Sequence, residues 1–177
     1  MFNRKNTLSL VFLAALIFMG LAFKAGNKVF PELTGTTLNG KTVSLPKQTH
    51  GKFTVLGIAY SLKAQDDLNT WYQPIYTEVM ENKFIPAAVY FIPMTGNIKG
   101  MSQEKIKSKM KEGMDSEWHK YVLVYQEKPD DYIKELGMTE KDKTYIFVLN
   151  PNGEIVYSTN GEFTRPKMDA IIDKLSE

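Results

Sequence analysis

The chain has 177 residues, of which 43% are hydrophobic and 12% aromatic, so it can bury one good core and is expected to form one folded domain. Its 22 Lys and Arg residues stand against 20 Asp and Glu residues, and the formal net charge of +2 provides no strong field for nucleic acid. The sequence contains no cysteine, which excludes disulfides, thiolate nucleophiles and cysteine-bound zinc or iron–sulfur clusters.

The first 25 residues predict a signal peptide or membrane anchor, and residues 26–177 predict the folded domain. Arg4 and Lys5 precede an uncharged apolar run, TLSLVFLAALIFMGLAF, which Lys24 ends. The run is long for a signal core and short for a membrane span, so cleavage and retention both stay open. In either case the leading basic residues place the domain outside the cytoplasm. We therefore expect a periplasmic or other extracytoplasmic protein, anchored to the inner membrane if the segment is retained.

The domain is expected to open with a β-hairpin, a buried strand and an amphipathic helix. Asn39-Gly40 separates two alternating segments and predicts a hairpin with a type I′ turn. The apolar, β-branched run at residues 52–60 predicts a strand that is buried on both faces. Pro74 lies in the following helix and is expected to kink it. The apolar stripe of this helix comprises Leu68, Trp71, Tyr72, Ile75, Tyr76 and Val79.

The rest of the domain continues a βαβ pattern and ends with a hairpin and a helix. Residues 85–94 predict a second buried strand, parallel to the strand at residues 52–60 because a helix connects the two. The remaining elements, in order, are a helix over residues 102–113 capped by Ser102 and ended by Gly113, a strand over residues 120–126, a short helix from Pro129 to Gly137, a hairpin over residues 144–159 and a final helix capped by Thr164.

This order of elements resembles the extended thioredoxin fold of the exported redoxin and peroxiredoxin branch. The segments FPELTGTTLNGKTVSL and TYIFVLNPNGEIVYS look like the opening and closing hairpins of that branch, and the resemblance spans residues 29–175. It implies an α/β, thioredoxin-like three-layer fold with a central mixed sheet and an N-terminal hairpin, preceded here by the hydrophobic leader or anchor helix.

The chain departs from this family at the redox motif. The resemblance places the family's Cys-x-x-Cys on residues 63–66, which read KAQD, and its cis-proline on Lys143 or Thr144. Thiol–disulfide exchange requires a thiolate, and neither lysine nor aspartate can replace it. We therefore expect neither disulfide exchange nor thiol peroxidase activity, and we assign no catalytic residue.

The residues at this turn have a structural and a functional interpretation. Ser61 can cap the helix, and the carboxylates of Asp66 and Asp67 complement its positive end. Lys63 opposes the helix dipole and has no evident structural reason to be there, which favours a role in recognition. The functional interpretation treats the turn as a vestigial cleft that binds a peptide or small polar ligand. Its candidate binding residues are Tyr60, Lys63, Gln65, Asp66 and Lys143.

No pattern of metal-binding residues is apparent in the sequence. His50 and His119 are isolated from each other and from carboxylate clusters, so each is interpreted as a loop or packing residue. Met110 and Met114 lie at helical spacing with Ile106, and we interpret them as a core face rather than thioether ligands. We expect no metal and no cofactor.

The favoured function is a non-catalytic binding or assembly module, exported and membrane-tethered, for another envelope protein or peptide. The alternative is a redoxin-related enzyme that works without thiols through Lys63, Asp66 and Tyr60. A lysine nucleophile needs a lowered pKa, and the carboxylates beside Lys63 favour its charged form. The sequence therefore argues against the enzyme.

Overall fold

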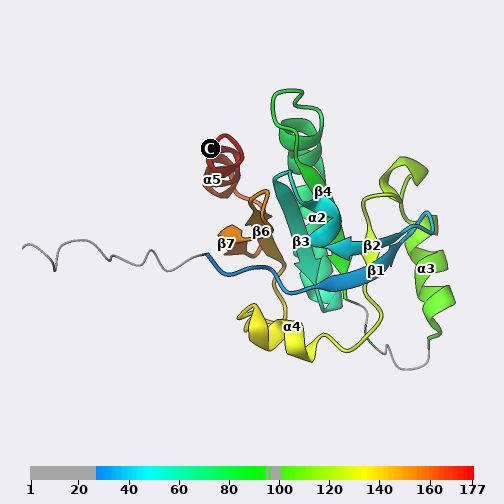
Figure 1. Ribbon diagram of the computed structural model, residues 1–177. Coiled ribbons are helices and arrows are strands. Elements are labelled where there is room, and N and C mark those ends of the chain that lie inside the picture. Colours follow the sequence, from blue (N-terminus) through cyan, green and yellow to red (C-terminus); the bar gives the residue numbers. More distant parts are fainter. Residues whose placement is uncertain (1–26, 95, 97–100) are drawn as a thin grey trace, which may run out of the picture.

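The computed structural model describes residues 27–94, 96 and 101–177, and the predicted leader or anchor helix lies outside these residues. The described elements form two β-sheets surrounded by helices (Figure 1). Their order along the chain agrees with the order predicted from the sequence. Within the described residues, no helix is both long and apolar enough to span a bilayer.

The N-terminal hairpin is present, but the predicted turn type is wrong. Strands β1 (Leu33–Thr37) and β2 (Thr42–Leu45) pair antiparallel. No described residue other than glycine has a positive φ, whereas a type I′ turn would require one at Asn39; only Gly40, with φ 94°, is left-handed here. The Thr37 hydroxyl donates to Asn39 Oδ1 at 2.6 Å, and Gly40 N donates to the Thr37 carbonyl at 2.9 Å. The connection is therefore a longer loop that ends in glycine.

The central sheet has the order β4–β3–β6–β7 and is mixed. Its strands are β3 (Thr54–Ala59), β4 (Ala88–Pro93), β6 (Tyr145–Leu149) and β7 (Ile155–Asn160). Strand β3 pairs parallel with β4 and antiparallel with β6, and β6 pairs antiparallel with β7. The predicted parallel pairing is confirmed, and every residue of the two middle strands is buried.

A short strand connects the two sheets. Strand β5 (Leu123–Val124) pairs antiparallel with β1 in the three-stranded sheet β2–β1–β5. Residues on either side of β5 form parallel bridges to the edge of the central sheet, Val122 with Phe91 and Tyr125 with Met94. The strand is shorter than predicted because its flanks pair with β4 while its centre pairs with β1.

Helix α2 (Leu62–Ile75) follows β3 and continues into a π-helix, η2 (Tyr76–Met80). Pro74 has no N–H to donate within α2. The next turn has the hydrogen bonds of a π-helix, which join residues five apart, such as Glu81 N to the Tyr76 carbonyl at 3.0 Å. The stripe predicted from the sequence faces the sheet, although its two tyrosines are only partly buried. Its fully buried members are Leu68, Trp71, Ile75 and Val79, and Ala64, which was not part of the predicted stripe, is buried as well.

Gly57, in the middle of β3, allows α2 to pack closely on the sheet. A Cβ atom at this position would lie 2.7 Å from Leu68 Cδ1 and 3.2 Å from Phe91 Cδ1. These separations are below normal carbon contacts, so a larger residue would push α2 away. Gly57 therefore allows α2, and the turn before it, to pack at a short distance from the sheet.

The other helices are shorter and mostly follow the predicted bounds. Ser102 caps α3 by accepting a hydrogen bond from Lys105 N at 3.3 Å, as predicted. Thr164 is the N-cap residue of α5, but its side chain makes no capping hydrogen bond. The elements are α3 (Gln103–Glu112), α4 (Asp130–Glu135) and α5 (Arg165–Leu175), with 3-10 turns η1 (Lys47–Thr49) and η3 (Ser116–Trp118).

The core lies on both faces of the central sheet, which gives the three layers that were expected. One face packs against α2 and α5, and the other packs against the β1–β2 hairpin and α4. Alternate residues of β3 divide between the faces: Val55 and Ala59 point to the α2 side, and Leu56 and Ile58 to the hairpin side. Helices α3 and α5 lie at opposite ends of the assembly (Figure 1).

Candidate functional site

The turn between β3 and α2 is an ordinary, well-capped helix start. Ser61 has an extended backbone and its Oγ accepts a hydrogen bond from Ala64 N at 3.0 Å, which confirms the predicted cap. Ala64 is fully buried against the core. Lys63 and Asp66 on either side of it are exposed. Of the four residues that align with the redox motif, one is therefore part of the packing and two face solvent.

Residues 139–144 hold one side of this turn through polar contacts. The Ser61 hydroxyl donates to Asp142 Oδ1 at 3.3 Å, and Lys63 Nζ lies 3.9 Å from Asp142 Oδ2. The sequence showed no partner for Lys63, and the structure places Asp142 close enough to pair with its charge. The Lys63 side chain remains 75% exposed, so it has none of the desolvation that a lysine nucleophile requires.

The two residues at the family's cis-proline position have different environments. Thr144 is buried, and its hydroxyl donates to the Ile58 carbonyl at 2.9 Å, which ties the start of β6 to the end of β3. Lys143 is exposed and pairs with Glu140 at 2.7 Å. The hydrogen bond from Lys143 lowers the pKa of the Glu140 carboxyl, and the same contact raises the pKa of Lys143. Lys143 therefore belongs to a surface ion pair.

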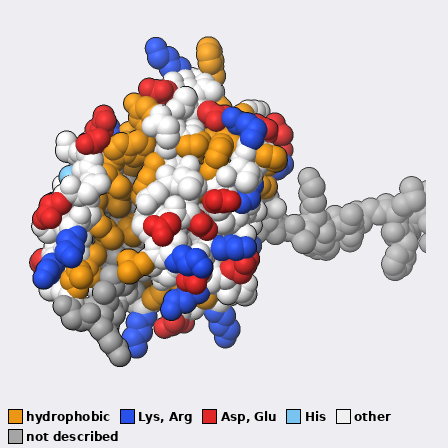
Figure 2. Space-filling model, turned by 180° about the vertical axis from the view of Figure 1, so that it is seen from behind, with side chains coloured by type: hydrophobic (Ala, Val, Ile, Leu, Met, Phe, Trp, Pro, Cys, Tyr) orange, Lys and Arg blue, Asp and Glu red, His pale blue; other side chains and the backbone are white. Residues whose placement is uncertain are grey.

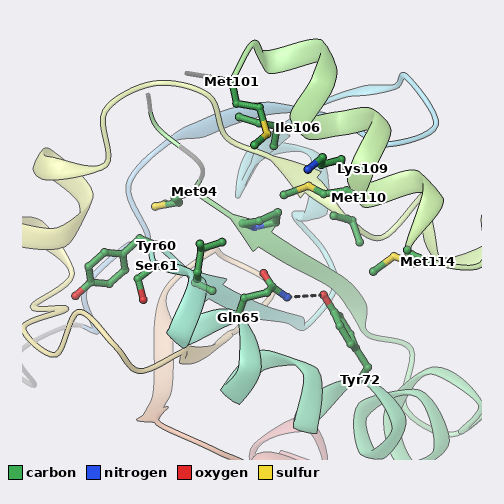
Figure 3. A pocket seen from close by; sticks show the side chains of 15 residues that line it. Tyr60, Ser61, Gln65, Tyr72, Met94, Met101, Ile106, Lys109, Met110 and Met114 are labelled. Atoms are coloured by element: carbon green, nitrogen blue, oxygen red, sulfur yellow. Dashed lines mark hydrogen bonds between the residues drawn. The ribbon is translucent and has the colours of Figure 1, made fainter. Parts of the chain in front are cut away.

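The other side of the turn opens into a cavity of about 580 Å³ between the start of α2, the end of β4 and helix α3. This volume is within the range of small-molecule and peptide-anchor sites. Figure 3 shows Gln65 and Tyr72 from α2 facing side chains of α3 across it. The lining residues are Ala59, Tyr60, Ser61, Leu62, Gln65, Tyr72, Pro93, Met94, Met101, Ile106, Lys109, Met110, Gly113, Met114 and Val122.

Four methionines contribute to the wall of this pocket, Met94, Met101, Met110 and Met114 (Figure 3). The interpretation of the two methionines of the α3 region as a core face was incomplete, because Ile106 is the buried residue of α3 while both methionines are partly exposed to the cavity. Methionine is flexible and polarisable, and it adapts to apolar partners of different shape. The wall is therefore suited to an apolar occupant.

The neutral polar side chains in the pocket lining each make a hydrogen bond within the protein. The Tyr60 hydroxyl donates to the Met138 carbonyl at 2.6 Å, and burial raises its pKa. Gln65 Nε2 donates to Tyr72 Oη at 3.3 Å and to Asn69 Oδ1 at 3.1 Å. Burial also raises the pKa of Tyr72, despite the opposing effect of the bond from Gln65. Both phenols thus stay neutral, and neither is placed to act as a base.

The structure brings together two of the five predicted binding residues. Tyr60 and Gln65 line the pocket, whereas Lys63, Asp66 and Lys143 lie outside its lining. The cleft function of all five stays a prediction. Sequence reasoning missed the contribution of α3, because helical periodicity marks an apolar face without showing whether a sheet or a cavity lies against it. The exposed lysines of α3 gave no signal for the pocket either, since they alternate around the helix.

Hydrophobic side chains also gather in a band on the face of the molecule shown in Figure 2, with charged side chains around them. Leu62, on the pocket lining, is 81% exposed. Tyr72 of the pocket lining also packs against a cluster of aromatic rings. Its ring centroid lies 5.7 Å from that of Trp118, and the Trp118 centroid lies 5.3 Å from that of Tyr76. The pocket is therefore bordered by further apolar surface that is only partly covered.

Candidate metal ligands do not converge in the part of the chain that the structure describes. No group of three or more His, Asp or Glu side chains is placed to hold an ion within residues 27–94, 96 and 101–177. His119 Nε2 lies 3.2 Å from the Met114 carbonyl and His50 is exposed, so they occupy separate places. Of the four pocket methionines, Met101, Met110 and Met114 lie on the α3 side of the cavity, and Met94 lies at the end of β4 (Figure 3).

Comparison with protein families gives one match that spans most of the chain. The family model described as ATP10 protein matches residues 20–176. The chain belongs to the ATP10 protein family. No curated protein matches it. The absence of cysteine, together with the geometry above, leaves this ATP10 protein without a catalytic redox site.

Solved structures show that the ATP10 chain has the thioredoxin-like fold expected from the resemblance. It is 18% identical to an exposed lipoprotein thioredoxin of Streptococcus pneumoniae, with a TM-score of 0.57, covering 82% of this chain and 98% of that one. It is 19% identical to the thioredoxin domain of a thiol-disulfide oxidoreductase of Bacteroides vulgatus, with a TM-score of 0.59 and coverage of 86% and 99%. A member of the Sco family of cytochrome c oxidase assembly proteins is 14% identical, with a TM-score of 0.55 and coverage of 84% and 92%.

Proposed function

We propose that this ATP10 protein is an assembly factor for ATP synthase and acts by binding, without catalysis. Membership of the family supports a role in ATP synthase assembly. Action without redox catalysis is supported by the sequence, because the chain keeps the thioredoxin-like fold but has no cysteine that can cycle as a thiolate. A thioredoxin-like fold without redox cysteines can still bind a partner, which is all that a binding module has to do.

The observation that carries this proposal is the apolar, methionine-lined pocket beside the retained turn. It lies where the start of α2, the end of β4 and α3 meet, and it is large enough to take several side chains of a partner. Buried apolar anchors in a central pocket supply most of the energy of protein interfaces. The pocket is therefore the proposed docking point for a subunit that awaits assembly.

The place of action that we propose is the extracytoplasmic side of the membrane, with the domain tethered by its N-terminal segment. The apolar run before Lys24 and the basic residues Arg4 and Lys5 support this orientation. A reporter enzyme fused after Val29 tests it. Reporter activity on the outer side of the membrane is expected, and a reporter that stays in the cytoplasm would overturn the location without touching the docking proposal.

The function itself is tested by deleting the gene and resolving membrane complexes on native gels. Cells without the protein are expected to accumulate unassembled ATP synthase subunits and little intact enzyme, and the full chain should restore assembly. A variant with two pocket substitutions, Met110→Gln with Met114→Gln, should fail to restore it although the protein accumulates normally. Normal ATP synthase levels in the deletion strain would refute the assembly function.

A further inference from the structure

The chemistry of the pocket specifies its occupant more closely than the family does. The neutral polar side chains of its lining form hydrogen bonds within the protein: Tyr60 with Met138, Gln65 with Tyr72, and Ser61 with Asp142. An occupant therefore meets few free neutral hydrogen-bonding groups in the described lining, chiefly Gln65 Oε1 and the hydroxyl proton of Tyr72. It gains by burying apolar surface against the methionines, Ile106 and Leu62.

Lys109 is the exception in this lining. It projects from α3 at the edge of the pocket (Figure 3), and its amine makes no ion pair or hydrogen bond with any residue that the structure describes. No aspartate or glutamate contributes to the described lining. The acidic residue closest to the C-terminal end of the helix, Glu112, accepts a hydrogen bond from Ser108 at 2.9 Å. Among the described residues, the pocket lining therefore carries one positive charge without a partner, that of Lys109.

We propose that the pocket binds an apolar segment of a membrane protein that carries one carboxylate, and that this carboxylate pairs with Lys109. The proposal rests on the assembly function above and names the chemistry that its docking site selects. The apolar side chains of the segment enter the cavity, while its acidic group stays at the mouth, where Lys109 can reach it without either charge being fully desolvated. An apolar segment of this kind is poorly soluble in water, and binding in the pocket would shield it until it is assembled.

The geometry favours a protein segment over a free fatty acid of the same chemistry. The cavity opens beside exposed Leu62 and next to the aromatic group of Tyr72, Tyr76 and Trp118, so apolar contact continues beyond the space that one acyl chain would fill. A helix or extended peptide can cover both the pocket and this border. A fatty acid would leave the border exposed to water.

The test uses the full chain, reconstituted in lipid nanodiscs, and two fluorescent Leu- and Ala-rich probe peptides of about 15 residues, long enough to form a helix. The peptides are identical except that one carries a central Glu and the other a central Gln. Fluorescence anisotropy measures their affinities. The Glu peptide should bind about fivefold more tightly at low salt, the upper end of what an exposed ion pair contributes, and added salt should reduce the difference.

Two lysine variants assign this preference to one side chain. Lys109→Gln should bind both peptides equally, whereas Lys111→Gln, which removes an exposed lysine of the same helix outside the pocket lining, should keep the preference. Equal affinity of the wild-type chain for both peptides, or a preference that survives Lys109→Gln, would overturn the proposal. Binding of oleate in a Lys109-dependent manner with no binding of either peptide would also overturn it, in favour of a lipid site.

These binding results can be separated from the assembly function. Native gels of cells that carry no copy of the gene report on ATP synthase assembly, whatever the pocket prefers. Normal assembly in such cells would refute the function and leave the measured peptide preference as a property of the pocket. Impaired assembly in those cells, with no peptide preference, would refute only the role of Lys109.

Discussion

The two sides of the α2 N-terminus differ in how many of their polar side chains form hydrogen bonds or ion pairs within the protein. On the side of residues 139–144, Asp142 contacts both Ser61 and Lys63, and Glu140 contacts Lys143. On the side of α3, the pocket wall is mostly apolar, and Lys109 in its lining has no partner among the described residues. The comparison indicates that the polar side serves the fold, while the pocket side is left for a partner. We call them the paired side and the pocket side.

The largest expected effect is on the helix that both sides share. Leu68 is fully buried between α2 and Gly57, and Leu68→Ala should lower the free energy of unfolding by about 2–5 kcal/mol because it leaves a cavity. Leu62→Ala is the matched control, since that leucine is 81% exposed and should change stability by less than about 0.5 kcal/mol. Denaturant unfolding measures both. Similar losses for the two variants would show that α2 is not anchored as described.

The next effect should appear on the pocket side and in binding rather than stability. Met114→Gln places an amide in the apolar wall, and burying it without a partner should weaken binding of the Glu probe peptide by about tenfold, close to 1.4 kcal/mol. Lys143→Gln on the paired side should leave this affinity unchanged. The division between the two sides fails if both variants weaken binding equally.

A smaller effect is expected from the paired side. Lys63→Ala and Asp142→Asn each remove one partner of an ion pair that is 75% and 56% exposed, so each should change the free energy of unfolding by at most about 1 kcal/mol. Both variants should restore ATP synthase assembly in deletion cells. If Lys63→Ala is stable but does not restore assembly, the recognition surface reaches Lys63, as the sequence interpretation held.

The smallest effect is a pH dependence within the paired side. The bond from Lys143 holds the pKa of Glu140 below its ordinary value of 4.5, so this contribution to stability is present above that pH and is lost as pH falls through the lowered pKa. The raised pKa of Lys143 keeps its contribution present below 10.5, with loss at higher pH. Wild-type and Glu140→Gln proteins should therefore differ in stability at neutral pH and converge in acid. A difference that persists in acid would point to another cause.

The fold was largely predictable because its central strands are continuous apolar runs. The stretches at β3 and β6 are apolar throughout and fully buried, β4 is mostly buried, and the helix between β3 and β4 favours their parallel pairing. The turn at Asn39 was mispredicted because the dipeptide alone does not show that the Thr37 hydroxyl bonds to the Asn39 side chain and shapes a longer loop.

The site was predictable only in part, because its decisive contacts are distant in sequence. Asp142 lies far along the chain from Lys63, so the partner of that lysine could not be read locally. Met110 and Met114 were recognised as an apolar face, but periodicity does not distinguish a face packed on a sheet from one that borders a cavity. The sequence identified the turn, and the structure shows which side of it is open.

Site-specific photo-crosslinking in intact cell envelopes tests the central claim most directly. A photoreactive amino acid replaces Met114 on the pocket side in one strain and Lys143 on the paired side in another, and the crosslinked partner is identified by mass spectrometry. We expect a membrane subunit of ATP synthase to be captured from position 114 and not from position 143. Capture of that subunit from position 143 alone, or from neither position while the protein still supports assembly, would contradict the account.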